Sequence, residues 1–362
     1  MLGTLGDGYL EWRGSMTWLR TRVRRVRPLK VAYRGLRRWL GMDCIQEFAI
    51  GIYHGDQPWT VRPALREQAP VLTRDHVSDV PAAFVADPFM IRHDDRWFMF
   101  FEVMRADTWR GEIAVATSCD GITWAYGQVV LAEGFHLSYP YVFEWDGDMY
   151  MIPETYEARS VRLYRAASFP STWVLERELL AGASYADASV FRHKDHWWMF
   201  VETSHRHPDM AVPPGEDTLR LFGAPALVGP WTEHPNSPVV AGDARIARPA
   251  GRVVVSEAKL VRFAQECVDT YGVRVHARQI EELTPTTYRE RRLTDHPVLG
   301  PGHLGWNNGG MHHIDAHRVG AAWIASVDGW SWKAPALARS APQWIGSIAR
   351  WLMTVRPCGR EN

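Results

Sequence analysis

The hydrophobic pattern of this chain consists of short apolar runs separated by polar turns. Residues 87–102 show the unit clearly: an apolar run, a turn at Asp94 and Asp95, and a second apolar and aromatic run, with a carboxylate at each end. Two such runs around a two-residue polar turn predict a β-hairpin. Reflection about the turn places Asp87 opposite Glu102.

The same hairpin recurs further along the chain, twice clearly and twice in weaker form. The residues that flank the later copies are, in chain order, Tyr139 and Glu154, Asp187 and Glu202, Ala250 and Gln265, and His313 and Asp328. Each pair is 15 residues apart, as Asp87 and Glu102 are. A supersecondary unit that recurs in this way indicates a repeat architecture, in which neighbouring units bury each other's apolar faces.

A third apolar run, a polar turn and a closing aromatic residue follow each of the first four hairpins, as in residues 112–124. Each unit therefore contains four strands, which is typical of a β-propeller blade. The fifth hairpin, residues 311–329, has no outer strand pair after it, whereas residues 48–59 match that missing pair. We predict an all-β, five-bladed β-propeller closed by the N-terminal segment, because closure removes an exposed sheet edge.

The pattern divides the chain into three parts. Residues 1–45 are predicted to form a basic amphipathic arm, in which Lys and Arg are interleaved with Trp, Leu and Val, and Pro28 divides two short helices. Residues 46–332 hold the propeller, and residues 333–362 form a tail with a short amphipathic helix. The segment 13–40 can lie on an anionic membrane surface, or it can dock on a protein partner.

The composition is that of an ordinary soluble protein, with 46% hydrophobic residues and 18 Trp among 362 residues. The formal net charge is zero, which gives no electrostatic argument for nucleic-acid binding. The four Cys are scattered and suggest neither a zinc site nor a disulfide framework. No apolar run approaches the ~18 residues that span a bilayer, and the N-terminus lacks the apolar core of a signal peptide, so we expect a cytoplasmic protein.

The ends of the hairpins are expected to carry the chemistry. In a propeller the first strand of each blade lines the central channel and the second strand returns beside it, so every flanking pair reaches one rim. Carboxylates close together cannot all ionise, and the raised pKa values that result suit acid and base catalysis. The alternative is structural, with the carboxylates accepting hydrogen bonds from amides and arginines of neighbouring blades. The predicted catalytic residues are Asp87, Asp187, Glu102 and Glu202.

Other residues near the same rim are predicted to bind substrate. They are Tyr139, Glu154, Arg248, Arg262, Gln265, Trp306, Asn307, His313 and Asp328. The arginines could grip a phosphate or a carboxylate, although a salt bridge to a rim acid is the alternative for one of them. We predict no metal site. A divalent cation near His313 is the alternative, since His313, Asp315 and His317 share one strand face, but one strand cannot by itself enclose an ion.

Several longer motifs carry a family resemblance. They are VPAAFVADPFMI, WFMFFE, SYPYVFEWDGDMYMIPET, ADASVF with FVET, and RPAG with RFAQECVDTYG. Over residues 46–330 the chain resembles the N-terminal domain of glucosamine inositolphosphorylceramide transferases and its stand-alone bacterial relatives. The resemblance implies a five-bladed propeller similar to those of family 43 glycoside hydrolases. In the plant enzymes a transferase domain follows this one; nothing resembling it is present here, so the resemblance does not imply the ceramide transferase activity.

The comparison with those hydrolases also implies roles for single residues. Their general base is an Asp at the start of the first blade, often followed by Pro, which corresponds to Asp87 and Pro88. The Asp of the second blade, which tunes the acid, corresponds to Tyr139 and is missing. The acid, a Glu at the start of the third blade, corresponds to Asp187. These departures imply chemistry other than simple hydrolysis.

We therefore predict a carbohydrate-active enzyme that performs glycosyl transfer in the assembly of a cell-surface glycan or glycolipid, at the inner face of the membrane. Its partners would be a sugar donor and a glycan or glycolipid acceptor. Asp87 would activate the acceptor hydroxyl, and Asp187 would act as the acid or stabilise an oxocarbenium-like centre. Two alternatives stay open: a non-catalytic glycan-binding or scaffolding propeller, and a glycoside hydrolase.

Overall fold

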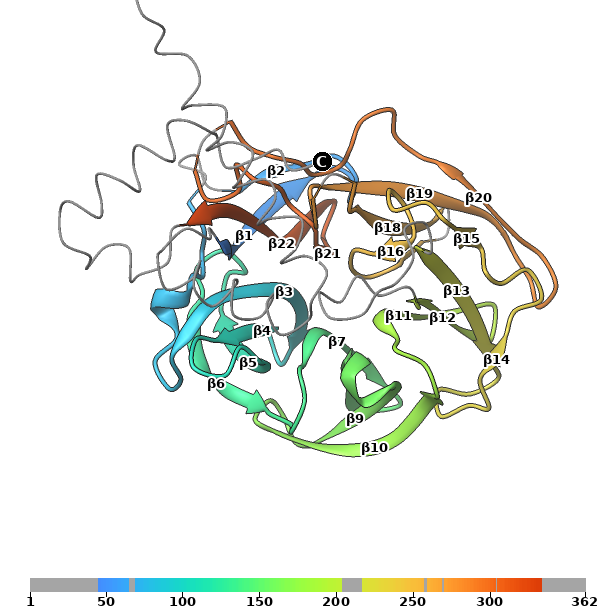
Figure 1. Cartoon of the computed structure of the whole chain (residues 1–362), viewed down its shortest axis with the longest axis horizontal. Helices are drawn as coiled ribbons and strands as arrows, with labels where there is room; N and C mark the ends of the chain where they lie inside the picture. Colours follow the sequence, from blue (N-terminus) through green and yellow to red (C-terminus); the bar gives the residue numbers. More distant parts are fainter. Residues whose placement is uncertain are drawn as a thin grey trace, which may run out of the picture. The chain divides into compact units, whose positions relative to one another are not determined.

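The chain folds as an all-β propeller of five sheets around a common centre (Figure 1), which confirms the predicted fold class. The computed structural model describes residues 45–64, 69–203, 217–256, 259–268, 270–303 and 305–333. The propeller makes up one compact unit, Glu47–Ser331. The predicted basic arm, apart from its last residue, and the predicted tail helix lie outside the described residues. Where the structure describes the chain, no helix has the length and apolarity to cross a membrane.

Each of the first four blades takes its strands from one continuous segment. The first blade contains β3 (Ala82–His93), β4 (Arg96–Arg105), β5 (Gly111–Ser118) and β6 (Ala125–Leu131). The second contains β7 (Ser138–Trp145), β8 (Asp148–Glu154), β9 (Ser160–Ser168) and β10 (Thr172–Ala181). The third contains β11 (Ala186–His193), β12 (His196–Glu202), β13 (Thr218–Ala224), β14 (Thr232–Glu233) and β15 (Val240–Ala241). The fourth contains β16 (Arg248–Pro249), β17 (Val254–Val255), β18 (Leu260–Glu266), β19 (Arg274–Leu283) and β20 (Tyr288–Arg292).

The fifth blade joins the two ends of the propeller. Its strand order is β2-β1-β22-β21, with β1 (Ile45–Gly55) and β2 (Val61–Pro63) added to the hairpin of β21 (Ile314–Val319) and β22 (Ala322–Lys333). The N-terminal segment therefore completes the last blade, as the sequence predicts. Two short 3-10 helices, η1 (Arg74–His76) and η2 (Tyr156–Ala158), lie in connections.

The inner hairpins turn where the sequence predicts. Asp94 and Asp95 connect β3 to β4 with φ angles of 47° and 59°, and Lys194 and Asp195 connect β11 to β12 with 49° and 58°. Two successive residues with positive φ are characteristic of the type I′ turn, whose twist matches that of the strands. The tight turns place the far ends of each hairpin side by side at one end of the propeller.

At those far ends, however, the predicted pairing is wrong by one residue in the first three blades and by two residues in the fourth. The ladder pairs Ala86, not Asp87, with Glu102, and the register shifts between Ala86 and Phe89 because Asp87 and Pro88 form a β-bulge. The same shift follows Ser138 in β7 and Ala186 in β11. In the fourth blade Arg248, not Ala250, lies opposite Gln265. Reflection about a turn assumes an uninterrupted ladder, and an extra residue in one strand breaks that assumption.

The three bulges share one backbone conformation. Asp87, Tyr139 and Asp187 have φ angles of 52°, 47° and 53°, in the left-handed region that costs roughly 1–3 kcal/mol for a residue other than Gly. Proline follows two of them, as Pro88 and Pro140, which is favourable because a bulged residue needs no ladder N–H. Three equivalent strained residues at one end of the propeller point to a functional site.

Buried apolar side chains fill the spaces between the blades. One cluster contains Phe100 of β4, Met151 of β8 and Met199 of β12, so it joins the first three blades. A second contains Ile50 of β1 and Val85 of β3, so it packs the fifth blade against the first. The ring is therefore closed by core packing as well as by the backbone pairing of β1 with β22.

We expect Ile50→Ala to lower the free energy of unfolding by about 2–5 kcal/mol, because Ile50 is fully buried where the ring closes. Urea denaturation followed by tryptophan fluorescence measures the change. Val319→Ala, in the same blade but at a side chain 45% exposed, should change it by less than about 0.5 kcal/mol. Equal effects of the two substitutions would contradict the assignment of β1 to the closing blade.

Candidate active site

Six buried carboxyl groups gather at the end of the propeller where the bulges lie. They are Asp87, Glu102, Glu154, Asp187, Glu202 and Asp328, which we call the carboxylate cluster. Asp87 and Glu102 come from the inner hairpin of the first blade, and Asp187 and Glu202 from that of the third. Glu154 comes from β8 in the second blade, and Asp328 comes from β22 in the fifth. The structure thus brings all six predicted carboxylates to one region.

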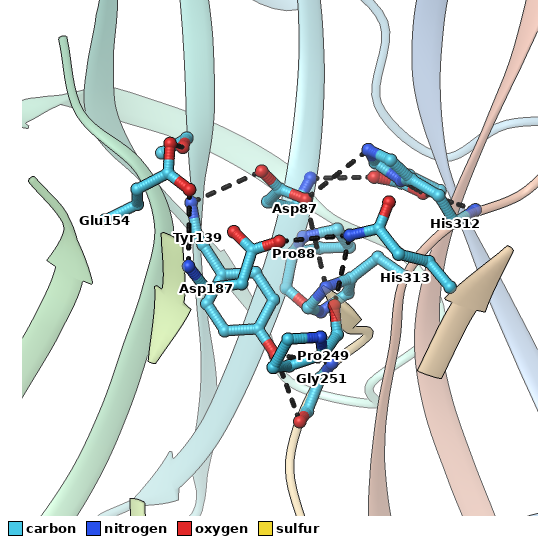
Figure 2. A network of polar contacts seen from close by, with 12 residues as sticks. Asp87, Pro88, Tyr139, Glu154, Asp187, Pro249, Gly251, His312 and His313 are labelled. Carbon is cyan, nitrogen blue, oxygen red and sulfur yellow. Dashed lines mark hydrogen bonds and ion pairs between the residues drawn. The ribbon is translucent and has the colours of Figure 1, made fainter. Parts of the chain in front are cut away.

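The bulged residues donate their backbone N–H groups to carboxylates of the preceding blade (Figure 2). The amide of Asp87 donates to Asp328 Oδ2 at 2.8 Å. The amide of Tyr139 donates to Asp87 Oδ2 at 3.3 Å, and the amide of Asp187 donates to Glu154 Oε2 at 3.2 Å. A buried N–H left unpaired costs about 1–3 kcal/mol, so these carboxylates are needed where the ladder is broken. Each bond also ties one blade to the next.

Arg248 of β16 neutralises the side of the cluster nearest the third and fourth blades. Its Nε donates to Asp187 Oδ2 at 2.6 Å, and its two Nη atoms donate to Glu202 at 3.1 Å and Glu154 at 3.2 Å. The predicted residue Gln265 adds a bond from Nε2 to Asp187 Oδ2 at 3.0 Å. Because a guanidinium stays charged, it offsets the negative charge that these carboxylates bring together. Asp187 Oδ2 is therefore held by two donors, the Arg248 guanidinium and the Gln265 amide.

Among the three carboxylates that accept the amide of a bulge, Asp87 accepts the fewest hydrogen bonds. Its Oδ1 makes no hydrogen bond shorter than 3.5 Å; it lies 3.7 Å from His312 Nε2 and 3.9 Å from His313 Nδ1. Burial raises the pKa of Asp87 to about 7, against the opposing effect of His312 and with further contributions from Asp328 and Asp187. Its side chain is nevertheless 11% exposed. A carboxyl that titrates near neutral pH and reaches solvent can accept a proton from a bound hydroxyl.

Glu102 is also poised for proton transfer. Burial, followed by the nearby charge of Asp87, raises the pKa of Glu102 well above its usual value. Its Oε1 is buried and makes no hydrogen bond, and His136 Nε2 is 3.6 Å away. Burial likewise raises the pKa of Glu154 despite the contact with Arg248. Glu102 is therefore the member of the cluster that is best placed to carry and donate a proton.

The position of Glu102 explains why its oxygen is unpaired. Glu154 and Asp328 also stand near the end of the second strand of their hairpins, and each accepts the amide of the next blade's bulge. In the first blade Asp87 takes that role, since it accepts the amide of Tyr139. Glu102 is thus left without the hydrogen bond that its counterparts make.

Tyr139 does not face the rim. In Figure 2 its ring points away from the carboxylates and toward Gly251. The hydroxyl accepts the Gly251 N–H at 2.6 Å and lies 2.8 Å from Ser189 Oγ. The ring packs edge-on against Phe89 and His313, with centroids 4.8 and 5.3 Å away. The side chain is 1% exposed. Tyr139 therefore ties the second, third and fourth blades together, and its position leaves no role in substrate binding.

Three other predicted substrate residues have structural contacts instead. Arg262 lies outside the cluster, because Glu290 of β20 binds its guanidinium at 2.6 and 2.7 Å. The salt bridge to a rim acid that the sequence offered as an alternative is made by Arg248, whereas the partner of Arg262 is an acid of an outer strand. Asn307 is 6% exposed and its Nδ2 lies 3.4 Å from Tyr53 Oη. Trp306 packs into the apolar cluster of the fourth and fifth blades.

Two side chains at the site were not among the predicted site residues. His312 is 3% exposed, and its Nδ1 lies 2.6 Å from Asp328 Oδ1. Tyr271 is 38% exposed; it lies over Arg248 at 5.3 Å and edge-on to His312 at 5.3 Å. Tyr271 lies in the quoted motif RFAQECVDTYG, but the alternation rule placed His312 on the opposite strand face from His313. That rule fails here because both histidines precede β21.

A metal ion would find few free ligands among the described residues. Asp87, His312 and Asp328 offer atoms within 4.8 Å of one another, but both oxygens of Asp328 already accept N–H groups, from the Asp87 amide and from His312. On the strand face proposed from the sequence, Asp315 is bound by Arg252 Nε at 2.8 Å and by His317 Nε2 at 2.8 Å. Hydrogen bonds and an arginine therefore already engage Asp315 and Asp328, whereas Asp87 Oδ1 makes no hydrogen bond.

The fold and the site define a five-bladed propeller with a buried acid cluster at one end. The chain belongs to the family of the N-terminal domain of glucosamine inositolphosphorylceramide transferase 1, whose profile matches residues 42–330. The match covers all five blades, which confirms the resemblance inferred from the motifs.

Named relatives agree with the family match. The chain is 36% identical over 304 residues to glucosamine inositolphosphorylceramide transferase 1 of Oryza sativa subsp. indica, which covers 78% of this chain and 40% of the rice protein. It is 31% identical over 300 residues to the Arabidopsis thaliana protein of the same name, of which it covers 39%. The chain thus spans less than half the length of these relatives.

Solved structures share the fold at low sequence identity. A β-1,2-mannobiose phosphorylase from Listeria innocua aligns with a TM-score of 0.54 at 12% identity, over 77% of this chain and 96% of that protein. A glycosyl hydrolase from Bacteroides ovatus aligns with a TM-score of 0.51 at 10% identity, over 75% and 96%. At this identity the likeness establishes the propeller fold alone.

We expect Arg248→Met to destabilise the protein by about 3–5 kcal/mol at pH 8, because it leaves three buried carboxylates without their cation. Loss of the cation raises the pKa of these groups in the folded state, so the folded protein holds protons more tightly than the unfolded chain does. The deficit should therefore shrink as the pH falls to 5. Denaturant titrations at both pH values measure it.

The control for this prediction is Arg192→Met, which removes an exposed ion pair with Asp195. That substitution should cost less than about 1 kcal/mol at either pH. A deficit in Arg248→Met that stays the same between pH 8 and pH 5 would argue against a shared role in neutralising the cluster.

Proposed function

We propose that this protein is a carbohydrate-active enzyme that transfers a glycosyl group to a hydroxyl of a glycan or glycolipid acceptor. The observation that carries the proposal is Asp87: a carboxyl in a strained bulge, with one oxygen free of hydrogen bonds and a pKa raised by burial to about 7. Strain and a pKa near neutrality at one residue are typical of catalytic groups.

In the reaction we propose, Asp87 Oδ1 takes the proton of the acceptor hydroxyl as its oxygen attacks the anomeric carbon. The bond from that carbon to the leaving oxygen breaks, and Glu102 supplies the proton that the leaving oxygen receives. A buried carboxylic acid and a nearby carboxylate provide the acid and the base of glycosyl chemistry. Glu102 thereby takes over the acid role that the sequence offered to Asp187.

The remaining carboxylates have supporting roles in this proposal. Asp187, Glu154 and Glu202 share Arg248, which holds their oxygens in place. Their oxygens can accept hydrogen bonds from sugar hydroxyls, and any negative charge on them would stabilise positive charge at the anomeric centre. Tyr271 is exposed beside Arg248 and offers an aromatic ring on which a sugar can stack.

The names of the relatives support sugar transfer as the reaction class, since each is a glucosamine inositolphosphorylceramide transferase. We propose a sugar donor and a glycan or glycolipid acceptor as the substrates. We also propose a cytoplasmic location at the inner membrane face, with the basic segment 13–40 in contact with anionic lipid. Vesicle flotation with and without residues 1–44 would test the membrane contact.

One observation favours the second candidate, a non-catalytic glycan-binding propeller. Five of the six carboxylates already accept a hydrogen bond that ties blades together, so a structural explanation covers much of the cluster. It does not cover Glu102 Oε1 and Asp87 Oδ1, which serve no such bond. The two candidates therefore differ in what these two residues do.

We expect Asp87→Asn to reduce turnover by about 10²-fold or more while leaving the fold intact. Asn tolerates the left-handed backbone and can still accept the Tyr139 amide, so only the base is lost. Turnover is measured by mass spectrometry with panels of sugar nucleotides, oligosaccharides and inositol-containing glycolipids. Asp195→Asn, in an exposed hairpin turn, is the control. Wild-type binding of glycans without turnover of any donor, and unchanged binding in Asp87→Asn, would support the binding-module candidate instead.

The pH dependence follows from the same assignment. Because Asp87 must be ionised to accept a proton and burial raises its pKa to about 7, kcat/KM should rise with pH through about 7. Glu102→Gln, which cannot donate the proton, should remove the falling limb at higher pH and lower kcat. A rising limb near pH 4, the ordinary range of Asp, would rule out Asp87 in its buried state as the base.

A further inference from the structure

His312 is held so that only one of its ring nitrogens is free. Its ring stacks on Phe48 with centroids 4.7 Å apart and meets the edge of Tyr271 at 5.3 Å. Its Nδ1 lies 2.6 Å from Asp328 Oδ1, and because a carboxylate accepts hydrogen bonds, Nδ1 carries a hydrogen. The remaining nitrogen, Nε2, lies 3.7 Å from Asp87 Oδ1.

Asp328 holds both His312 and Asp87 in place. While Oδ1 accepts the His312 ring N–H, Oδ2 accepts the backbone N–H of Asp87 at 2.8 Å. The same carboxylate therefore sets the position of the imidazole and the backbone of the bulge. Although burial opposes it, His312 holds the pKa of Asp328 below its usual value, so this anchor stays ionised.

His313 approaches the same oxygen of Asp87 with the opposite hydrogen-bonding character. Its Nε2 lies 3.1 Å from the Pro88 carbonyl oxygen, which can only accept, so Nε2 carries the hydrogen. Its Nδ1 is then a lone pair; it is buried, makes no hydrogen bond and lies 3.9 Å from Asp87 Oδ1. Burial lowers the pKa of His313 to about 4, which keeps this ring neutral.

We propose that His312 and His313 are positioning residues that poise Asp87 between its two protonation states. Protonated His312 stabilises the carboxylate by directing a charged N–H toward Oδ1. Neutral His313 stabilises the carboxylic acid by presenting a lone pair to the same atom. A donor on one side and an acceptor on the other let Asp87 take up a proton and release it without a change in the surrounding structure.

Other charged groups face this pair from every neighbouring blade, and they set the sign of the expected effects. Around Asp87 these are Glu102 from its own blade, Asp187, Arg248 and Asp328. Around His312 they are Asp328, Asp87 and Asp187, with the phenol of Tyr271 against its ring. Asp328 raises the pKa of His312 despite burial, which favours the charged imidazolium. Removal of that charge should raise the pKa of Asp87, because His312 opposes the effect of burial on Asp87 more strongly than Arg248 does.

The test is a direct titration by NMR of the full chain, which needs no substrate. Side-chain carboxyl carbons of Asp are labelled with ¹³C, and the Asp87 signal is assigned by its loss in Asp87→Asn. The titration midpoint of Asp87 is expected to rise by about 1 pH unit or more in His312→Gln. In His313→Met, which removes the acceptor, it is expected to fall. His296→Gln, at an exposed histidine, is the control and should leave it unchanged.

Imidazole ¹⁵N shifts report the two histidines separately. At pH 7 both nitrogens of His312 should be protonated, and His313 should be neutral with hydrogen on Nε2. An unshifted or lowered midpoint in His312→Gln, or a neutral His312 at pH 7, would overturn the proposal. The proposal rests on the proposed function only in taking Asp87 as the base. If the midpoint shifts as expected but the protein turns over no donor, the role of the two histidines stands and the proposed transferase activity is rejected.

Discussion

The structure depends on the hydrogen bonds between bulge amides and the carboxylates of the preceding blade. Each bulge breaks the ladder and leaves an amide inside the propeller, where an unpaired N–H is costly. Asp328, Asp87 and Glu154 satisfy the amides of Asp87, Tyr139 and Asp187 in turn, so the series links the fifth blade to the first, second and third. Arg248 continues it from Asp187 to the fourth blade, and the Ile314 amide returns to the Ala250 carbonyl at 2.9 Å to complete the circle.

The same arrangement explains where chemistry becomes available. Arg248 offsets part of the negative charge of the carboxylates that it binds, whereas burial raises the pKa of Asp87 to about 7 and raises the pKa of Glu102. Asp87 Oδ2 accepts the Tyr139 amide, whereas Asp87 Oδ1 makes no hydrogen bond. Glu102 Oε1 makes none either, because Asp87 accepts the bulge amide that Glu102 would otherwise accept. The three amides in strained bulges must be paired, and this requirement gives Asp87 and Glu102 different hydrogen-bonding environments. These two residues, the proposed base and acid, each keep one oxygen without a hydrogen bond.

The sequence predicts the fold much better than the site. Alternating runs and two-residue turns such as Asp94 and Asp95 are local signals, and the missing strand pair of the fifth hairpin is enough to predict closure by residues 48–59. The bulges at Asp87 and Asp187 are not local signals, because an Asp with positive φ looks the same in sequence as one in a regular strand. The topology was enough to predict that the six carboxylates lie together. The partners of the predicted arginines could not be predicted, since the pairing of Arg262 with Glu290 depends on how the outer strands pack.

Tyr139 shows how this family can keep the propeller while its chemistry changes. The bulge needs only a backbone N–H and an acceptor from the preceding blade, so the side chain of the bulged residue is free to vary. In the second blade that side chain is a phenol, which turns inward and binds Gly251, and Glu154 serves as the acceptor for the third blade instead. Propellers that share only 10–12% of their residues with this chain retain its architecture. Function must therefore be argued from Asp87, Glu102 and the two histidines rather than from the fold.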